Sequence, residues 1–310
     1  MNDRIKRLAK TVIYYSPKAL RNRFHKKVEA RRIKEGLERY KRFKVGKDEF
    51  DAILSEIEFD SDVMLHTSLL NIGHVAGGVK FVTETLLKHI DTTRHTLVVS
   101  ALPYFGSFAD YLKEDLVFDA RTAPVAMGSV NEKLTRREEA RRSPHPTHSV
   151  AAIGPDAEEY TGEHHLDETP FGVHSPYYKL IKNNAKVLLV GATMDNVTLV
   201  HAIEDMVGEE HPVKDIYAPK RFSVKAITDK GDEVRVVTPY HNPKRGMYRR
   251  DIMLDDGLDK GYIRQWKVGD GFIRLIDARA YAEAYIDMMK QGRNLYGRCK
   301  KLRPDFKLPL

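Results

Sequence analysis

Side chains that could accept or donate a proton are concentrated between residues 145 and 201. Six of the 13 histidines fall in this stretch: His145, His148, His164, His165, His174 and His201. Imidazole titrates near neutral pH and is the most frequent general acid or base in enzymes. His201 and Glu204 are three residues apart in a predicted helix, so their side chains share one face. A carboxylate beside an imidazole fixes the ring and raises its basicity, which favours a general base; a partly buried histidine beside a solvated glutamate is the alternative.

A small-residue turn follows the first apolar strand pattern. The segment 64–78, MLHTSLLNIGHVAGG, reads as a strand, a turn and the start of a helix. It matches neither the dinucleotide-binding nor the P-loop glycine spacing. Glycines still allow a close approach of backbone to ligand, and amides at a helix N-terminus attract anions such as phosphate. An ordinary turn that needs positive φ angles explains the same residues.

A metal site is weakly supported. Cys299 is the single cysteine and no C-x-x-C pattern exists, so neither a zinc ribbon nor an intrachain disulfide is expected. His164, His165, Asp167 and His174 could bind a metal in a hydrolase, but their spacing matches no standard ligand motif. We therefore predict no metal.

Alternating helix and strand patterns predict the architecture. Apolar runs at 96–103, 149–154 and 186–192 read as strands, the last as a central strand covered on both faces. Residues 221–240 contain two strand patterns, RFSVKAI and EVRVVTPY, around TDKGD, which is typical of a β-hairpin, and 277–292 predict a late helix ended by glycine. The fold class expected is α/β (an α+β sandwich), with a central mixed β-sheet flanked by helices.

Charge divides the chain into two parts. Residues 1–44 hold 16 Lys/Arg against 4 Asp/Glu, a net +12, and the rest holds 36 against 40, a net −4. The basic character belongs to a helical arm, 1–46, so the whole-chain charge does not predict nucleic-acid binding. The arm packs on the body or on a second subunit, or lies on an anionic membrane surface as a peripheral contact. With no long apolar run and no secretory signal, a cytoplasmic protein is expected.

Four separated motifs carry a resemblance to a known family. HTSL with Gly73, Gly77 and Gly78, then RRSPHPTHS, then FGVHSP, then VLLVGATMDNVTLVHAIE occur in this order. The series closely resembles the aminoglycoside 3-N-acetyltransferase family, which is acyl-CoA dependent. The resemblance covers about residues 47–290, so 47–310 is expected to be the acyltransferase domain.

The resemblance implies acetyl-CoA as cosubstrate and direct acyl transfer. The positions implied to bind the cosubstrate are His66, Thr67, Ser68, Gly73, Gly77, Gly78, Ser143 and Thr198. The positions that match the family motifs and are expected to act in catalysis are His145, His201 and Glu204. Asp167 is added as a catalytic candidate because of its carboxylate. His145 is expected to be the base or to support it, although its flanking prolines also fit a rigid turn with an exposed histidine. Asp167 is expected to hold the acceptor ammonium or a histidine.

The function expected is transfer of an acetyl group to a primary amine of an amino sugar. An aminoglycoside, with antibiotic resistance as the outcome, is the leading acceptor. A nucleotide-linked amino sugar of surface polysaccharide synthesis is the alternative. A non-catalytic scaffold that uses the basic arm is a third interpretation, which the intact motifs disfavour. No oligomeric state is predicted.

Overall fold

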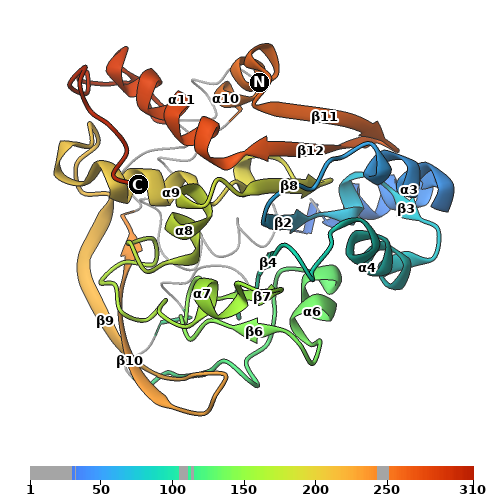
Figure 1. Ribbon diagram of the computed structural model, residues 1–310, viewed down its shortest axis with the longest axis horizontal. Helices are drawn as coiled ribbons and strands as arrows, with labels where there is room; N and C mark the ends of the chain where they lie inside the picture. The colour runs from blue at the N-terminus through green and yellow to red at the C-terminus, as the bar shows by residue number, and fades with distance from the viewer. Residues whose placement is uncertain (1–29, 32, 105–110, 113–114, 243–250) are drawn as a thin grey trace.

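A seven-stranded mixed sheet forms the centre of the molecule (Figure 1). The computed structural model describes residues 30–31, 33–104, 111–112, 115–242 and 251–310. The strand order is β11-β12-β8-β2-β4-β7-β6. β2 pairs in parallel with β8 and β4, and the other neighbouring strands are antiparallel. In this order the strands are Ile263–Val268, Gly271–Asp277, Lys186–Val190, Val63–Thr67, Leu97–Ser100, Val150–Ile153 and Arg141–Arg142.

The central strands separate two hydrophobic cores. Val187 and Leu189 of β8 belong to one core, and Leu188 and Val190 belong to the other. Successive strand residues point to opposite faces, so a continuous apolar run predicts burial on both sides. The predicted sandwich with a central mixed sheet is confirmed.

Helices cover both faces of this sheet. The first core is closed by α7 (Ala157–Thr161), α8 (Pro176–Lys182), α9 (Val200–Val207), α10 (Ile252–Lys260) and α11 (Ala278–Lys290). The second core is closed by α3 (Lys47–Ser55), α4 (Gly78–His89) and α6 (Ser129–Thr135). Local signals set several of these helices: Ser175 caps α8 by accepting a hydrogen bond from the Tyr178 amide, and the Asp277 side chain caps α11.

The predicted hairpin is confirmed and is longer than the other strands. β9 (Tyr217–Ile227) and β10 (Glu233–His241) pair antiparallel, and β5 (Val117–Asp119) adds to β9 in parallel. The hairpin runs along one side of the molecule, away from the main sheet (Figure 1). A register shift between Pro239 and His241 leaves His241 opposite Tyr217 at the open end. This end reaches the helices of the first core.

The described part of the basic arm packs on the body. Residues 33–42 are helical, and β1 (Lys44–Val45) pairs in parallel with β3 (His74–Val75). Arg39 Nε lies 2.6 Å from Asp270 Oδ2. The predicted helix within 1–29 lies outside the described residues.

Short elements complete the chain. They are η1 (Leu69–Asn71), η2 (Met194–Asn196), η3 (Gly208–Glu210), β13 (Arg293–Asn294) and β14 (Gly297–Arg298). No helix in the described ranges has both the length and the apolar character needed to cross a bilayer.

Candidate active site

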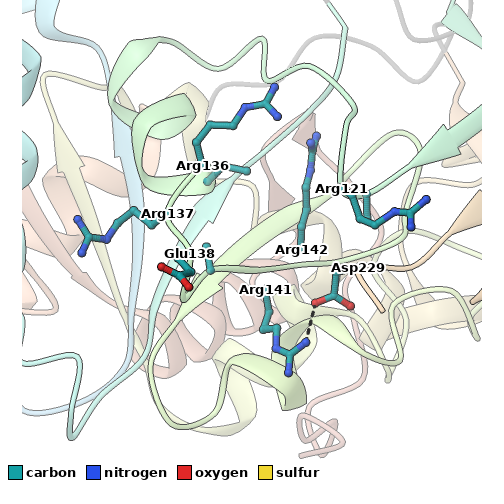
Figure 2. Close-up of a pocket in the computed structure, with 10 residues that line it drawn as sticks. Arg121, Arg136, Arg137, Glu138, Arg141, Arg142 and Asp229 are labelled. Atoms are coloured by element: carbon teal, nitrogen blue, oxygen red, sulfur yellow. Dashed lines mark hydrogen bonds and ion pairs between the residues drawn. The ribbon is translucent and has the colours of Figure 1, made fainter. Parts of the chain in front are cut away.

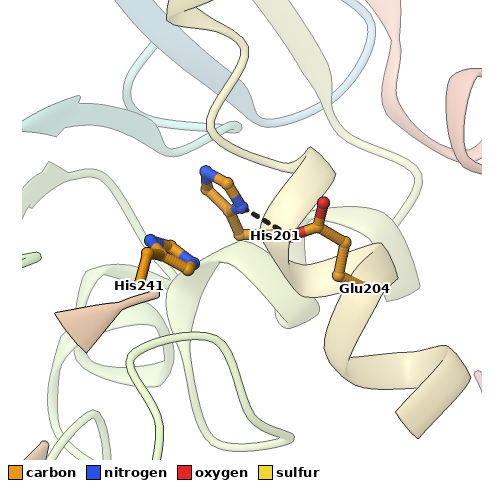
Figure 3. A group of neighbouring side chains, drawn as sticks. All are labelled: His201, Glu204 and His241. Atoms are coloured by element: carbon orange, nitrogen blue, oxygen red, sulfur yellow. Dashed lines mark hydrogen bonds and ion pairs between the residues drawn. The ribbon is translucent and has the colours of Figure 1, made fainter. Parts of the chain in front are cut away.

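The helix after the central strand carries the strongest chemistry. α9 follows β8, so it begins near the edge where the parallel strands β2, β4 and β8 end. Open α/β sheets bind ligands at this edge. Within α9, His201 Nδ1 lies 2.8 Å from Glu204 Oε2 (Figure 3). The predicted shared face is therefore a direct contact.

Both side chains of this contact are buried. The His201 side chain is 8% exposed and that of Glu204 is fully buried. A buried polar group is costly unless it is hydrogen-bonded, so the two groups hold each other in place. A carboxylate only accepts, so Nδ1 must donate and the lone pair of the neutral ring lies on Nε2. Nε2 is then the atom that can take a proton.

A tyrosine from near the C-terminus completes the pair. Tyr296, between β13 and β14, donates its hydroxyl to Glu204 Oε1 over 2.8 Å. Both carboxylate oxygens are therefore held, one by His201 and one by Tyr296. The Glu204 carboxylate cannot turn without breaking one of these bonds, which fixes the orientation of the imidazole. Sequence patterns did not indicate Tyr296, because 92 positions separate it from Glu204.

Aromatic rings surround His201. Its ring centroid lies 4.1 Å from that of His241 and 5.0 Å from that of Phe171. His241 stacks on Tyr217, with 5.0 Å between the ring centroids and 13° between the planes. The open end of the hairpin thus supplies one wall of the site. Nothing in the sequence around His241 distinguishes it from an ordinary strand residue.

A buried carboxyl lies behind this wall. Asp205 accepts a hydrogen bond from the Tyr217 hydroxyl over 2.7 Å and one from Thr169 Oγ1 over 2.5 Å. Burial raises the pKa of Asp205 to about 7, against the lowering effect of these hydrogen bonds. Asp205 is thus placed to hold the hairpin against α9.

A second histidine cluster surrounds His145. Its Nδ1 accepts from the backbone amide of His148 over 3.1 Å, and its ring stacks on His164 with 4.5 Å between centroids. His145 is fully buried, and burial lowers its pKa well below the usual value. This burial differs from the exposed turn that its flanking prolines alone would suggest. Among the described residues, His145 Nε2 has no hydrogen-bond partner.

His164 is held on both sides. Ser143 Oγ lies 3.0 Å from Nδ1, and Nε2 lies 2.9 Å from the Pro170 carbonyl. The carbonyl requires a donor, so Nε2 carries the proton and Nδ1 accepts from Ser143. Burial lowers the pKa of His164 to about 3. Phe171 connects the two clusters, because its ring lies 4.7 Å from that of His148 and 5.0 Å from that of His201.

Comparison with known proteins shows the family to which the chain belongs. The family profile described as aminoglycoside 3-N-acetyltransferase matches residues 64–290. Aminoglycoside N(3)-acetyltransferase IX of Micromonospora chalcea is 32% identical over 247 residues, which cover 71% of this chain and 84% of that protein. The chain belongs to the aminoglycoside 3-N-acetyltransferase family.

Solved structures of acetyltransferases share the fold. The crystal structure of aminoglycoside acetyltransferase AAC(3)-Xa is 28% identical with a TM-score of 0.61, covering 81% of this chain and 94% of that one. AAC-IIIb, solved as a binary complex with CoASH, is 22% identical with a TM-score of 0.63, covering 77% and 94%. This second match shows the fold alone. The predicted family and fold class are thereby confirmed.

The positions that the family resemblance assigns to the cosubstrate lie on both sides of the sheet edge. His66 follows Met64 on the face of β2 that faces the first core, and it is 7% exposed. Thr67 points to the other side, where its hydroxyl donates to Asn131 Oδ1 of α6 over 2.9 Å. The Ser68 amide donates to the Val190 carbonyl of β8 over 2.8 Å. All three residues therefore lie where β2 and β8 end.

The three glycines of the turn have different surroundings. Gly73 has φ +111°, and a Cβ there would lie 2.5 Å from the Phe43 carbonyl oxygen. Its absence of a side chain allows β1 to pair with β3. Gly77, at the N-terminus of α4 with φ +84°, would place a Cβ against Phe81. A Cβ on Gly78, at φ +61°, would meet no atom within 4 Å, so this position leaves open space beside the first turn of α4.

The other predicted site residues have structural partners. Ser143 is buried, and its Oγ also accepts from the Val150 amide over 3.0 Å. Thr198 precedes α9, and its carbonyl accepts from the His201 amide over 3.1 Å. Asp167 binds the backbone amide of His174 over 2.8 Å and the His174 ring over 2.9 Å. These hydrogen bonds join Asp167 to His174 within the loop before α8, and not to His201 or Glu204.

A separate concavity is lined by arginines (Figure 2). It encloses about 330 Å³ between the end of α6, strand β6 and the turn of the β9–β10 hairpin. Arg142, the arginine of the RSPHP motif, is buried and donates to the carbonyls of Ala101, Ala123 and Pro124. Arg141 lies 3.3 Å from Asp229 across the opening. The positive lining would repel a polycationic aminoglycoside, so this concavity is unsuited to that acceptor.

Proposed function

We propose that this chain transfers the acetyl group of acetyl-CoA directly to a primary amine of an amino sugar, with an aminoglycoside as the leading acceptor. The observation that supports this most is the buried His201–Glu204–Tyr296 arrangement at the edge where the parallel strands end. The family name and the CoASH complex of AAC-IIIb support acetyl-CoA as cosubstrate.

The reaction needs a base, an acyl donor and an acceptor held together. The amine nitrogen attacks the thioester carbonyl carbon, a C–N bond forms, and the C–S bond breaks to release CoA. His201 Nε2 takes the proton that the amine loses, and the CoA sulfur leaves as thiolate or takes a proton from the imidazolium. Glu204 stabilises the imidazolium, and Tyr296 holds Glu204. His145 is proposed to support the site through its contact with His148, not to meet the amine itself.

Direct transfer is consistent with the state of the lone cysteine. Burial raises the pKa of Cys299, so its thiol stays protonated at neutral pH. A thiol in that state is a poor nucleophile. An acetylated enzyme intermediate on Cys299 is therefore disfavoured.

Thiol release from acetyl-CoA tests this function. Two acceptor sets are compared: aminoglycosides with a free amine on the deoxystreptamine ring, and nucleotide-linked amino sugars. Release with the first set supports an antibiotic-modifying enzyme, and release only with the second supports polysaccharide synthesis. Release with neither set, together with no binding of acetyl-CoA, would overturn the proposal.

Replacement of the base gives the matched test. We expect His201→Ala to lower kcat by about 10²-fold or more, the range for loss of a general base. His174→Ala removes a nearby histidine outside the pair and should keep turnover. Wild-type turnover in His201→Ala would contradict the assignment of His201.

We also propose that the basic arm makes a peripheral contact with an anionic membrane surface. Vesicles containing anionic lipid should bind the full chain more tightly than neutral vesicles, and added salt should weaken this binding. A chain that lacks residues 1–29 should lose the difference between the two vesicle types. If the full chain and the shortened chain bind anionic vesicles equally well, residues 1–29 do not contribute to membrane binding, and the arm has a packing role only.

A further inference from the structure

His201 and Glu204 also belong to a group of possible metal ligands, which acyl transfer does not require. His201, Glu204 and His241 each offer a ligand atom, and these atoms all lie within 4.8 Å of one another (Figure 3). Among the described residues, these three form a group of histidine and carboxylate side chains that could hold a metal ion. His201 and Glu204 are buried and His241 is partly buried.

The chemistry of these three groups suits a borderline transition metal. Two imidazoles and one carboxylate form a ligand set that zinc uses, with a further position left for solvent. Tetrahedral zinc bonds of about 2.0–2.2 Å place ligand atoms about 3.3 Å apart. Since the three ligand atoms lie within 4.8 Å of one another, small side-chain shifts suffice to bring them to this spacing. Ca²⁺ and Mg²⁺ prefer oxygen ligands and fit poorly.

One ligand, Glu204, has a hydrogen-bonded outer partner of the kind that orients ligands in zinc sites, and His241 is held by ring stacking. Tyr296 holds the second oxygen of Glu204 at 2.8 Å, and Tyr217 stacks on His241. Tyr217 is in turn anchored to Asp205. Outer partners of this kind fix ligand geometry and strengthen metal binding.

We propose that His201, Glu204 and His241 form a Zn²⁺ site whose occupation inhibits the enzyme. This inference rests on the proposed role of His201 as the base. A zinc ion on Nε2 blocks the lone pair that accepts the proton. A zinc ion on Nδ1 requires the single proton of the neutral ring to sit on Nε2 instead, which removes the Nε2 lone pair, so the base is lost in either case. This set differs from the four residues that the sequence analysis weighed as metal ligands and set aside, which are His164, His165, Asp167 and His174.

Direct zinc binding is the first measurement. The full chain, stripped with a chelator, is titrated with Zn²⁺ in competition with a chromophoric zinc indicator. His241→Phe removes one ligand and keeps an aromatic ring between Phe171 and Tyr217, and His174→Ala is the matched control. We expect His241→Phe to weaken zinc binding by more than about tenfold. Removal of an outer partner alone already costs at least about that much, and His241 is a direct ligand. Equal affinity in His241→Phe and wild type would overturn the site.

Inhibition is measured on the same three proteins. The acetylated acceptor is quantified by mass spectrometry, because the free thiol of CoA itself binds zinc. We expect micromolar-range zinc to suppress product formation by wild type and His174→Ala, but not by His241→Phe. Zinc that binds wild type without suppressing turnover would overturn the inference.

The two measurements separate this inference from the proposed function. If no acceptor is acetylated by any variant but zinc binding depends on His241, the acyltransferase role fails and the inhibitory part falls with it, while the metal-binding site stands. If transfer occurs and zinc binding is independent of His241, the function stands and the site fails. Visible absorption of bound Co²⁺ in wild type, lost in His241→Phe, would give independent support for the ligand set.

Discussion

At the scale of single residues, the site depends on one carboxylate held from two directions. Glu204 is fully buried, with one oxygen on His201 and the other on Tyr296. The arrangement orients His201 as a base: its Nδ1 donates to Glu204, and the lone pair that can take the proton lies on Nε2. The i, i+3 spacing in the sequence predicted the first contact. The second contact required the folded chain, because no local pattern links position 296 to a helix near 200.

We expect Glu204→Gln to lower kcat by about 10²-fold and to leave the KM for acetyl-CoA nearly unchanged. The amide keeps the shape of the side chain but no longer stabilises the imidazolium. Steady-state kinetics with varied acetyl-CoA measure both constants. A change confined to KM would show that Glu204 acts in binding instead.

Tyr296→Phe should have a smaller effect of the same kind. Loss of one hydrogen bond to the carboxylate is worth about 1.5–3 kcal/mol, which corresponds to about 10- to 100-fold in kcat. As Tyr296 is a positioning residue, the pH profile of kcat should shift together with the rate. Tyr178→Phe, which removes a hydroxyl that donates to the Pro309 carbonyl, is the control and should not shift the profile.

At the scale of elements, the glycine turn combines two roles that the sequence did not separate. Gly73 allows β1 to approach, whereas Gly78 has open space beside the start of α4. The long apolar strand and the late helix were predictable because burial and period determine them. β1, β3 and the β11–β12 pair were not identified, since the first two have two residues each and β11 carries charged residues between apolar ones.

Gly73→Ala and Gly78→Ala should therefore differ. The first places a methyl group 2.5 Å from the Phe43 carbonyl oxygen at a positive φ, which should cost about 1–3 kcal/mol of stability. The second costs only about 1–2 kcal/mol for the left-handed backbone, because no atom is in contact. Urea unfolding measures both values. If Gly78 lies against acetyl-CoA, as the family resemblance implies, Gly78→Ala should also raise the KM for acetyl-CoA, whereas Gly73→Ala should act mainly on stability.

The hairpin explains why the candidate site was only partly predictable. Its two strands were expected from alternation and from the turn at TDKGD. His241 reaches His201 because a register shift near Pro239 places it opposite Tyr217 at the open end. A shift of one residue would turn the imidazole to the other face. Sequence alone does not report such a shift, so the third member of the cluster could not be found from it.

At the scale of the whole molecule, buried histidines couple folding to pH. Burial lowers the pKa values of His145, His164, His165 and His211. The unfolded chain takes up protons at these positions as the pH falls through about 6.5, whereas the folded chain does not. The free energy of unfolding should therefore decrease on acidification. Asp205 opposes this trend, because its pKa of about 7 lets the folded chain bind a proton that the unfolded chain does not.

The net direction can be measured. The four histidines outnumber Asp205, so below about pH 6.5 the unfolded chain should bind more protons than the folded chain, and stability should fall with pH. Urea unfolding at about pH 7.5 and at about pH 5.5 should show the loss. Asp205→Asn removes the opposing group and should steepen it. Stability that rises on acidification would contradict the buried, neutral state of the histidines.

The contact between Tyr296 and Glu204 also bears on how the protein is made. During synthesis, His201 and Glu204 emerge well before the hydroxyl that holds the carboxylate. A growing chain, or one cut before position 296, can contain every motif of the family and still have a carboxylate free to turn. Full activity should therefore arrive late in biosynthesis, and premature termination before position 296 should lower turnover at least as far as Tyr296→Phe does, even where most of the fold survives.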